Sequence, residues 1–296
     1  MISDKNISED MLNSFKKRWS ELDWENKRHF SYRAARISKD DFWDKKMKSF
    51  LPMTMKEYVK LNSRNNKERI SLEDSLSIFS ADIPSNFLKV KIQNKYPGLI
   101  YLDRLFTHYR YLYLFDLVNK VEQIKKVDLV EAIALDSEVL KNWPVWSIER
   151  IFDLFWFFGV DMTLKLKNTF IELYSVKSDD ERFRVNYWYG LTHVVLGRSS
   201  FYRKRVDDNW AGKLLVEGFD EIISDFSIDL ASETGVCLRL CGYEDRVDFK
   251  KLEARISDEF DEEEKLILRD GFSDLNKLEH RNILSLMALG SFRKII

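Results

Sequence analysis

Three side chains that could carry out acid–base or metal chemistry lie in otherwise apolar parts of the sequence: His193, Glu233 and His280. An ionisable group in an apolar helix requires a partner or a shifted pKa. Two imidazoles and a carboxylate can bind zinc or iron, and they can also form an acid–base pair. A third interpretation is a hydrogen-bond network that only fixes the register of the helices. We take these three as candidate catalytic residues, and as metal ligands if a divalent metal is the cofactor.

The helix that carries His193 begins at a capping pattern in which Glu181 follows Ser178, and it is expected to run to about Tyr202. At about 100° per residue, a narrow stripe of small and polar residues follows one side of it. A glycine inside a helix costs about 1 kcal/mol relative to alanine. The two glycines in this stripe therefore indicate close helix packing, or alternatively room for a ligand, with close packing favoured. The stripe consists of Asn186, Tyr189, Gly190, His193, Gly197 and Ser200, and we take Asn186 and Tyr189 as ligand-binding candidates.

The other two candidate residues belong to two later helices. Glu233 lies in a helix expected over 228–241 and ended by Gly242, and Asp229 precedes it by one turn on the same face. His280 lies on the apolar face of a closing helix over 273–293, with Asn276 one turn before it. We expect Asp229 and Asn276 to lie close enough to the three candidates to orient them or to contact a ligand.

The composition predicts an all-α fold. Ten glycines and four prolines among 296 residues are few, while hydrophobic residues make up 45% and charged residues 33%. Scarce helix breakers with abundant Leu, Lys, Glu and Phe favour helix over sheet. We expect antiparallel helical hairpins in a single large domain over 1–296, with a possible subdivision near 144–146.

Several local expectations follow from the pattern of residues. The segment 151–158 is apolar nearly all round and should be buried on every side, with Gly159 ending its helix. Helices are also expected over 71–79, 99–124, 207–225 and 261–269, and an isolated strand over 89–93. The acidic run at 258–264 is interpreted as a helix start, where negative charge is favourable.

The run at 189–193, YGLTH, followed by DLASE at 229–233, resembles bacterial helical-hairpin proteins of the α/α-toroid kind. The resemblance covers the chain from about residue 147 onward. It implies paired helices around an axis, with inner helices whose polar residues line a central cavity. An irregular helical array is the alternative arrangement.

Charge and cysteine usage bear on partners and location. The formal net charge is −1, and acids are interspersed with the basic and aromatic residues of the N-terminal part, so nucleic acid is not an expected partner. We also expect no membrane segment, because the longest uncharged stretch near the candidate site has 13 residues and a span requires about 18–20. Cys237 and Cys241 share one helix and cannot form a relaxed disulfide, which favours a reducing, cytoplasmic setting.

Three classes of function stay open. The first is an enzyme or ligand-binding protein with a polar cavity built on His193, Glu233 and His280, whose partner is a small molecule. The second is a protein-interaction module, such as an immunity or adaptor protein, in which the same cluster is only structural. The third and weakest is nucleic-acid binding through the N-terminal basic and aromatic residues.

Overall fold

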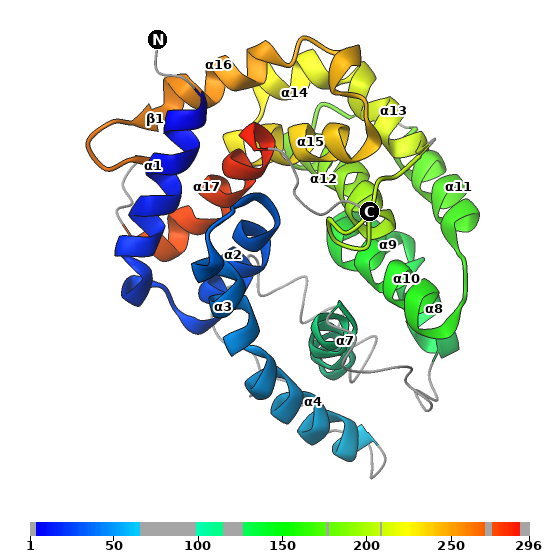
Figure 1. The fold of residues 1–296 in the computed structure, drawn as a ribbon. Coiled ribbons are helices and arrows are strands. Elements are labelled where there is room, and N and C mark those ends of the chain that lie inside the picture. The colour runs from blue at the N-terminus through cyan, green and yellow to red at the C-terminus, as the bar shows by residue number, and fades with distance from the viewer. Residues whose placement is uncertain are drawn as a thin grey trace. The chain divides into compact units, whose positions relative to one another are not determined.

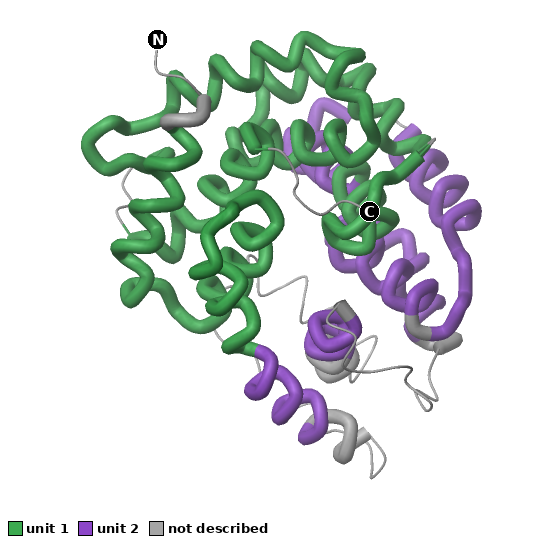
Figure 2. The backbone as a smooth tube through the Cα atoms, in the orientation of Figure 1, with its two compact units in different colours: residues 1–50, 191–296 green, residues 51–190 purple. Residues whose placement is uncertain are grey.

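A computed structural model describes residues 4–65, 99–114, 127–175, 178–207, 209–269 and 274–290. These residues are almost wholly helical and include one short β-hairpin, so the predicted all-α class is confirmed (Figure 1). The chain divides into two compact units, residues 1–50 with 191–296 and residues 51–190 (Figure 2). We call them unit 1 and unit 2. Pro144 begins a helix, and the single domain expected over 1–296, with a possible subdivision near 144–146, stays a prediction.

Unit 1 holds most of the polar residues singled out in the sequence. Its long helices are capped as their sequences require: Asp23, Ser227 and Asp274 each accept a hydrogen bond from a backbone N–H in the first turn. Its elements are α1 (Asp4–Lys17), η1 (Trp19–Glu21), α2 (Trp24–Ile37), α3 (Asp41–Ser49), the second half of α12 (Glu181–Arg198), α13 (Trp210–Glu217), α14 (Phe219–Asp225), α15 (Ile228–Cys241), η2 (Glu244–Arg246), α16 (Lys250–Glu259), β1 (Phe260–Asp261), β2 (Leu266–Ile267) and α17 (Leu275–Leu289).

Helix α15 is the core element of unit 1. It contacts α13, α14, α16 and α17, and every one of its residues except Asp229 and Arg239 is buried. Gly242 ends it with a φ of 65°, as predicted. A helix covered on all sides in this way leaves its polar residues no water to bind, so Glu233 must find partners within the protein.

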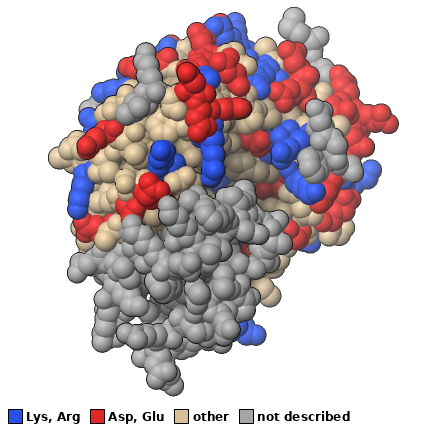
Figure 3. Space-filling view, turned by 180° about the vertical axis from the view of Figure 1, so that it is seen from behind, with Lys and Arg blue, Asp and Glu red and all other residues tan. Residues whose placement is uncertain are grey.

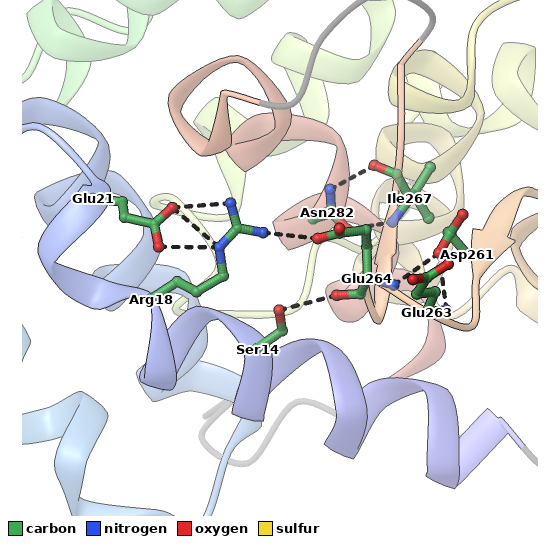
Figure 4. A network of polar contacts seen from close by, with 8 residues as sticks. All are labelled: Ser14, Arg18, Glu21, Asp261, Glu263, Glu264, Ile267 and Asn282. Atoms are coloured by element: carbon green, nitrogen blue, oxygen red, sulfur yellow. Dashed lines mark hydrogen bonds and ion pairs between the residues drawn. The ribbon is translucent and has the colours of Figure 1, made fainter.

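The β-hairpin corrects two expectations. Residues 261–269 do not form a helix, and the acidic run lies at the end of α16 and in the hairpin turn, not at a helix start. Phe260 pairs with Ile267, both are buried, and the Asn282 side chain clamps the backbone of Ile267 through bonds of 2.8 and 2.9 Å. Arg18, which directly follows α1, holds the turn from the other side, because it bonds both Glu21 and Glu264 (Figure 4).

Unit 2 consists of α4 (Leu51–Asn65), α7 (Leu99–Leu114), α8 (Val127–Ala134), α9 (Ser137–Asn142), α10 (Pro144–Phe158), α11 (Thr163–Tyr174) and the first half of α12. The expected helix over 99–124 is described up to Leu114, and the expectations at 71–79 and 89–93 lie outside the described residues. Helix α10 ends at Gly159, which has a φ of 67°, as predicted.

The expectation that α10 is buried on every side is wrong. Leu154 is fully buried, but Phe155 is 38% exposed, because the helices that pack on α10 leave this side uncovered. The buried side also carries charge. Asp153 forms an ion pair with Arg150 at 2.9 Å, and Arg110 lies 3.5 Å from the same carboxylate, so the buried charges compensate each other.

Gly190 serves close packing, the favoured of the two interpretations. A Cβ added there would meet the ring of Phe170 at 2.6 Å. Helix α12 itself is shorter than expected: it ends at Arg198, not near Tyr202. Helices α13 and α14 likewise replace the single helix expected over 207–225, with Gly218 between them.

Charges of both signs are mixed on the surface. Lys and Arg side chains alternate with Asp and Glu over the face shown in Figure 3, as the interspersed sequence predicts. In the described part of the chain, no helix combines the length and the apolar character that crossing a membrane requires.

Candidate functional site

Glu233 is the deepest acidic group of the candidate site. It is 2% exposed and accepts a hydrogen bond of 2.5 Å from the Thr192 hydroxyl. The same carboxylate oxygen lies 3.4 Å from Nε2 of His193. The Cys237 thiol, one turn further along α15, donates to the backbone carbonyl of Thr192. Helices α12 and α15 are thus joined in unit 1 around one buried carboxylate.

His280 of α17 lies against the first turn of α15, one turn before Glu233. Its Nδ1 is 3.5 Å from Oδ1 of Asp229, and the other oxygen of that carboxylate accepts from Arg281 at 3.2 Å. The Arg281 guanidinium also donates to the carbonyl of Leu268, so it is fixed at both ends. The His280 side chain is 47% exposed. It is the part of the cluster that solvent reaches most easily.

A third histidine completes the cluster. Nδ1 of His29, on α2, lies 2.7 Å from Oε1 of Glu279, which is 2% exposed. Glu279 precedes His280 on α17, and the rings of His29 and His280 stack with centroids 5.5 Å apart and planes at 29°. We name the three pairs, His193–Glu233, His280–Asp229 and His29–Glu279, the imidazole–carboxylate cluster.

The surroundings push the two stacked imidazoles toward opposite charge states. Burial, followed by the positive charge of Arg33, lowers the pKa of His29 to about 4, against the opposing effect of Glu279. Burial also acts to lower the pKa of His280, but the hydrogen bond to Asp229 and the charges of Glu233 and Glu279 outweigh it, so that pKa is raised. Near neutral pH, His29 is therefore neutral, and His280 carries more positive charge than a free histidine.

The same contacts favour the ionised form of Asp229. Burial opposes ionisation, but the hydrogen bond from His280 and the charges of His280 and Arg281 lower the pKa of this carboxyl. Asp229 is therefore a fixed acceptor for Nδ1 of His280. A histidine held through Nδ1 presents Nε2 to a ligand, and the same holds for His29 on Glu279.

The structure brings together most of the residues singled out in the sequence. Glu233 lies beside His193 and its charge acts on His280, and Asp229 lies beside Nδ1 of His280. The catalytic and orienting roles expected for these residues stay predictions. Asn276 does not join them. Its side chain accepts from the N–H of Asp23 and donates to the carbonyl of Glu21, so it ties α17 to the start of α2.

The two ligand-binding candidates at the start of α12 belong to unit 2. Asn186 donates to the carbonyl of Lys141 at 3.0 Å, and Tyr189 is half-buried. The ligand-binding roles expected for both residues stay predictions.

Sequence reasoning missed His29 and Glu279. The pair joins positions 250 residues apart, and no local pattern announces such a contact. A signal for Glu279 existed, since it directly precedes His280 on a helix that was expected to face inward. The N-terminal segment offered less, because its mixed charges are typical of a solvated helix.

The geometry suits proton transfer better than metal binding. Among the residues that the structure describes, no three His, Cys, Asp or Glu side chains are grouped so that they could hold a metal ion. A neutral imidazole accepts a proton and a charged one donates a proton, so the stacked pair offers a base and an acid side by side.

Fold and site together define an all-α protein with an imidazole–carboxylate cluster around a buried core helix. A family model described as "Domain of unknown function (DUF3541)" matches residues 10–294. The chain belongs to this family. Searches among curated proteins and among solved structures find no match.

Proposed function

We propose that unit 1 binds a small polar molecule at the imidazole–carboxylate cluster and exchanges protons with it. His29 acts as the base through Nε2, and His280 acts as the acid through Nε2–H. The observation that supports this assignment is the pair of stacked rings, 5.5 Å apart, whose surroundings favour opposite charge states. Titratable pairs with separated pKa values are a common feature of acid–base sites.

The buried carboxylates complete this assignment. Asp229 and Glu279 orient the two rings, and the charge of Glu233 favours the protonated form of His280. His193 shares Glu233 with Thr192, which places this imidazole at the inner end of the cluster. His193, Glu233 and His280 thus remain the catalytic candidates, now joined by His29.

Exposure favours a ligand site over a purely structural network. A network that only fixes helix register gains by being sealed, since buried hydrogen bonds are protected from competition with water. Here the two glutamates are sealed, while the side chain of His280 is 47% exposed and that of His29 is 26% exposed. The arrangement presents imidazole nitrogens to solvent over buried carboxylates.

Location and arrangement belong to the same proposal. Cys237 and Cys241 are free, buried thiols, which supports action in a reducing compartment such as the cytoplasm. The contribution of α12, α15 and α17 to one polar cluster supports the α/α-toroid-like arrangement of inner helices that the sequence suggested.

The test is a thermal-shift screen of the full chain against sugars, nucleosides, amino acids and short carboxylic acids, with Zn²⁺ as a separate probe. Wild type is compared with Glu233→Gln, which keeps the shape of the side chain and removes its charge, and with His280→Gln. Glu253→Gln is the matched control, because Glu253 lies on α16 outside the cluster. A compound at 100 times its Kd stabilises a protein by about 2.7 kcal/mol.

The outcomes separate function from structure. The site is supported if a compound class raises the Tm of wild type and of Glu253→Gln but not that of Glu233→Gln or His280→Gln. Both of these variants must have normal stability without the compound. A Zn²⁺ effect with the same pattern supports a metal centre in place of acid–base chemistry. Destabilised variants in the absence of any selective compound effect would assign the cluster to structure alone.

A second candidate function, protein interaction, is favoured by one observation in unit 2. Leu164 is 71% exposed and Ile171 is 39% exposed, and their spacing of two helical turns places them on one face of α11. Isolated exposed apolar residues are normal, but two on one face suit a partner contact. Replacing both with Asp should abolish co-purification of such a partner and leave ligand effects at the cluster unchanged.

A further inference from the structure

The turn that follows α12 has an unusual backbone. Ser200, Phe201 and Tyr202 have φ values of 52°, 50° and 66°. The left-handed conformation costs about 1–2 kcal/mol for each L-residue, and none of the three is glycine. Such a run persists only where the surrounding structure holds it, and strained backbone of this kind gathers at functional sites.

Two neighbouring helices hold the turn in place. The Ser199 hydroxyl accepts from the N–H of Tyr202 at 2.9 Å, and the Phe201 N–H donates to the carbonyl of Leu196 at 3.0 Å. From α2, the Tyr32 hydroxyl donates to the carbonyl of Phe201 at 3.1 Å. The result is a Tyr202 side chain that is 1% exposed and faces α2.

Tyr202 contacts the residue that follows Tyr32. The Arg33 guanidinium lies 5.3 Å from the centre of the Tyr202 ring, a cation–π contact. Arg33 also donates to the backbone carbonyl of His29, one turn earlier on α2. The guanidinium is thus held between the strained turn and the imidazole–carboxylate cluster.

We propose that Arg33, which lies against the Tyr202 ring and donates to the backbone carbonyl of His29, is a positioning residue whose fixed positive charge acts on the His29 imidazole beside His280. The inference deepens the proposed acid–base function and rests on it. Arg33 acts through the two histidines and needs no contact with the ligand. The left-handed turn places the Tyr202 ring against the guanidinium.

Several charged groups act on the two imidazoles, and Arg281, which shares the Asp229 carboxylate with His280, is a further cation beside them. His29 faces Arg33 on its own helix, and Glu279 and His280 on α17. His280 faces Asp229 and Glu233 on α15, and it also senses Glu279 and Arg33. The carboxylates favour the protonated form of both rings, so Arg33 is a fixed cation that opposes them.

The experiment is an NMR pH titration of the imidazole signals of the full chain. The chain has four histidines, so each signal can be assigned with one His→Gln variant. Arg33→Met should raise the pKa of His29 by about one unit or more, toward but not up to its ordinary value, because burial is the larger cause of its depression. Arg33→Lys, which restores the charge, should return that pKa most of the way.

Two further variants test the role of the turn. Tyr202→Leu removes the ring and should raise the pKa of His29 in the same direction as Arg33→Met, and Tyr202→Phe should do so less. Arg246→Met is the matched control, since Arg246 likewise lies against a tyrosine ring, that of Tyr243, but outside the cluster and the turn, and it should leave His29 unchanged. These variants also provide the readout if Arg33→Met does not fold.

The inference is overturned if folded Arg33→Met or Tyr202→Leu leaves the His29 titration unchanged, or if Arg246→Met moves it equally. Failure of the proposed function looks different. In that case Arg33→Met shifts the titration as expected, but no small molecule acts selectively on the wild-type cluster.

Discussion

His29 and His280 stack 5.5 Å apart, and each is bound through Nδ1 to a different carboxylate from a different helix. Glu279, the carboxylate partner of His29, is buried, while Asp229, the partner of His280, is shared with Arg281. Adjacent rings therefore have unequal surroundings, and a proton added to the pair favours His280.

Acid should destabilise the protein through His29. The pKa of His29 is about 4 in the folded chain and 6.5 for a free histidine, so the unfolded state binds this proton first as the pH falls. The stability contributed by the neutral ring is fully present above about pH 6.5 and is lost toward about pH 4. His280, whose pKa is raised, has the opposite effect: its contribution to stability grows as the pH falls through the region around 6.5 and is fully present below it, so it offsets part of the loss in the upper part of the window.

Urea unfolding at about pH 7 and about pH 5 measures this effect. We expect His29 to account for a loss on the order of 2 kcal/mol between the two pH values, so that wild type loses about that much more free energy of unfolding than His29→Gln does. An equal loss in both proteins would show that His29 is not the buried neutral group described here.

Two adjacent residues of α10 should differ sharply in their contribution to stability. Leu154→Ala removes a fully buried side chain and should lower the free energy of unfolding by about 2–5 kcal/mol. Phe155→Ala, at a position that is 38% exposed, should cost on the order of 1 kcal/mol although it removes more atoms. The urea midpoints of the two variants measure this difference. A larger loss in Phe155→Ala than in Leu154→Ala would restore the expectation that α10 is buried on all sides.

Gly190→Ala should destabilise unit 2 even though alanine is the better helix former. Its Cβ would lie 2.6 Å from Cε2 of Phe170, whose ring packs between Tyr174 and Tyr187. Overpacking of this kind costs about 1–3 kcal/mol, against about 1 kcal/mol of helix propensity gained. In a double-mutant cycle, Phe170→Leu should relieve part of the loss. Purely additive effects would mean that Gly190 does not serve this contact.

The elements that could be predicted from the sequence are those set by local signals. Helix α15 begins after Ser227 and ends at Gly242 because a cap and a left-handed glycine act within one turn. Residues 261–269 were expected to be helical because acidic residues favour a helix start. Burial of Phe260 and Ile267 and the clamp from Asn282 favour a hairpin instead, and these are contacts from distant segments.

The residues of the candidate site also differ in whether a local sequence signal points to them. Glu233 and His193 could be found because each interrupts an apolar helix, and a buried polar group needs a partner. His29 could not, since its partner Glu279 lies 250 residues away. The end of α12 could not be predicted either, because the left-handed run at Ser200–Tyr202 is imposed by contacts with α2 and not by the residues themselves.

The central claim is that the cluster holds one neutral and one charged imidazole side by side, and the wild-type histidine titration tests it most directly. Imidazole NMR signals are followed from about pH 3.5 to about pH 9, and the His29→Gln and His280→Gln variants are used to assign the signals of the two rings. We expect His29 to titrate near pH 4 and His280 above 6.5. Titration of both rings together near 6.5 would contradict the opposite charge states and, with them, the assignment of acid and base.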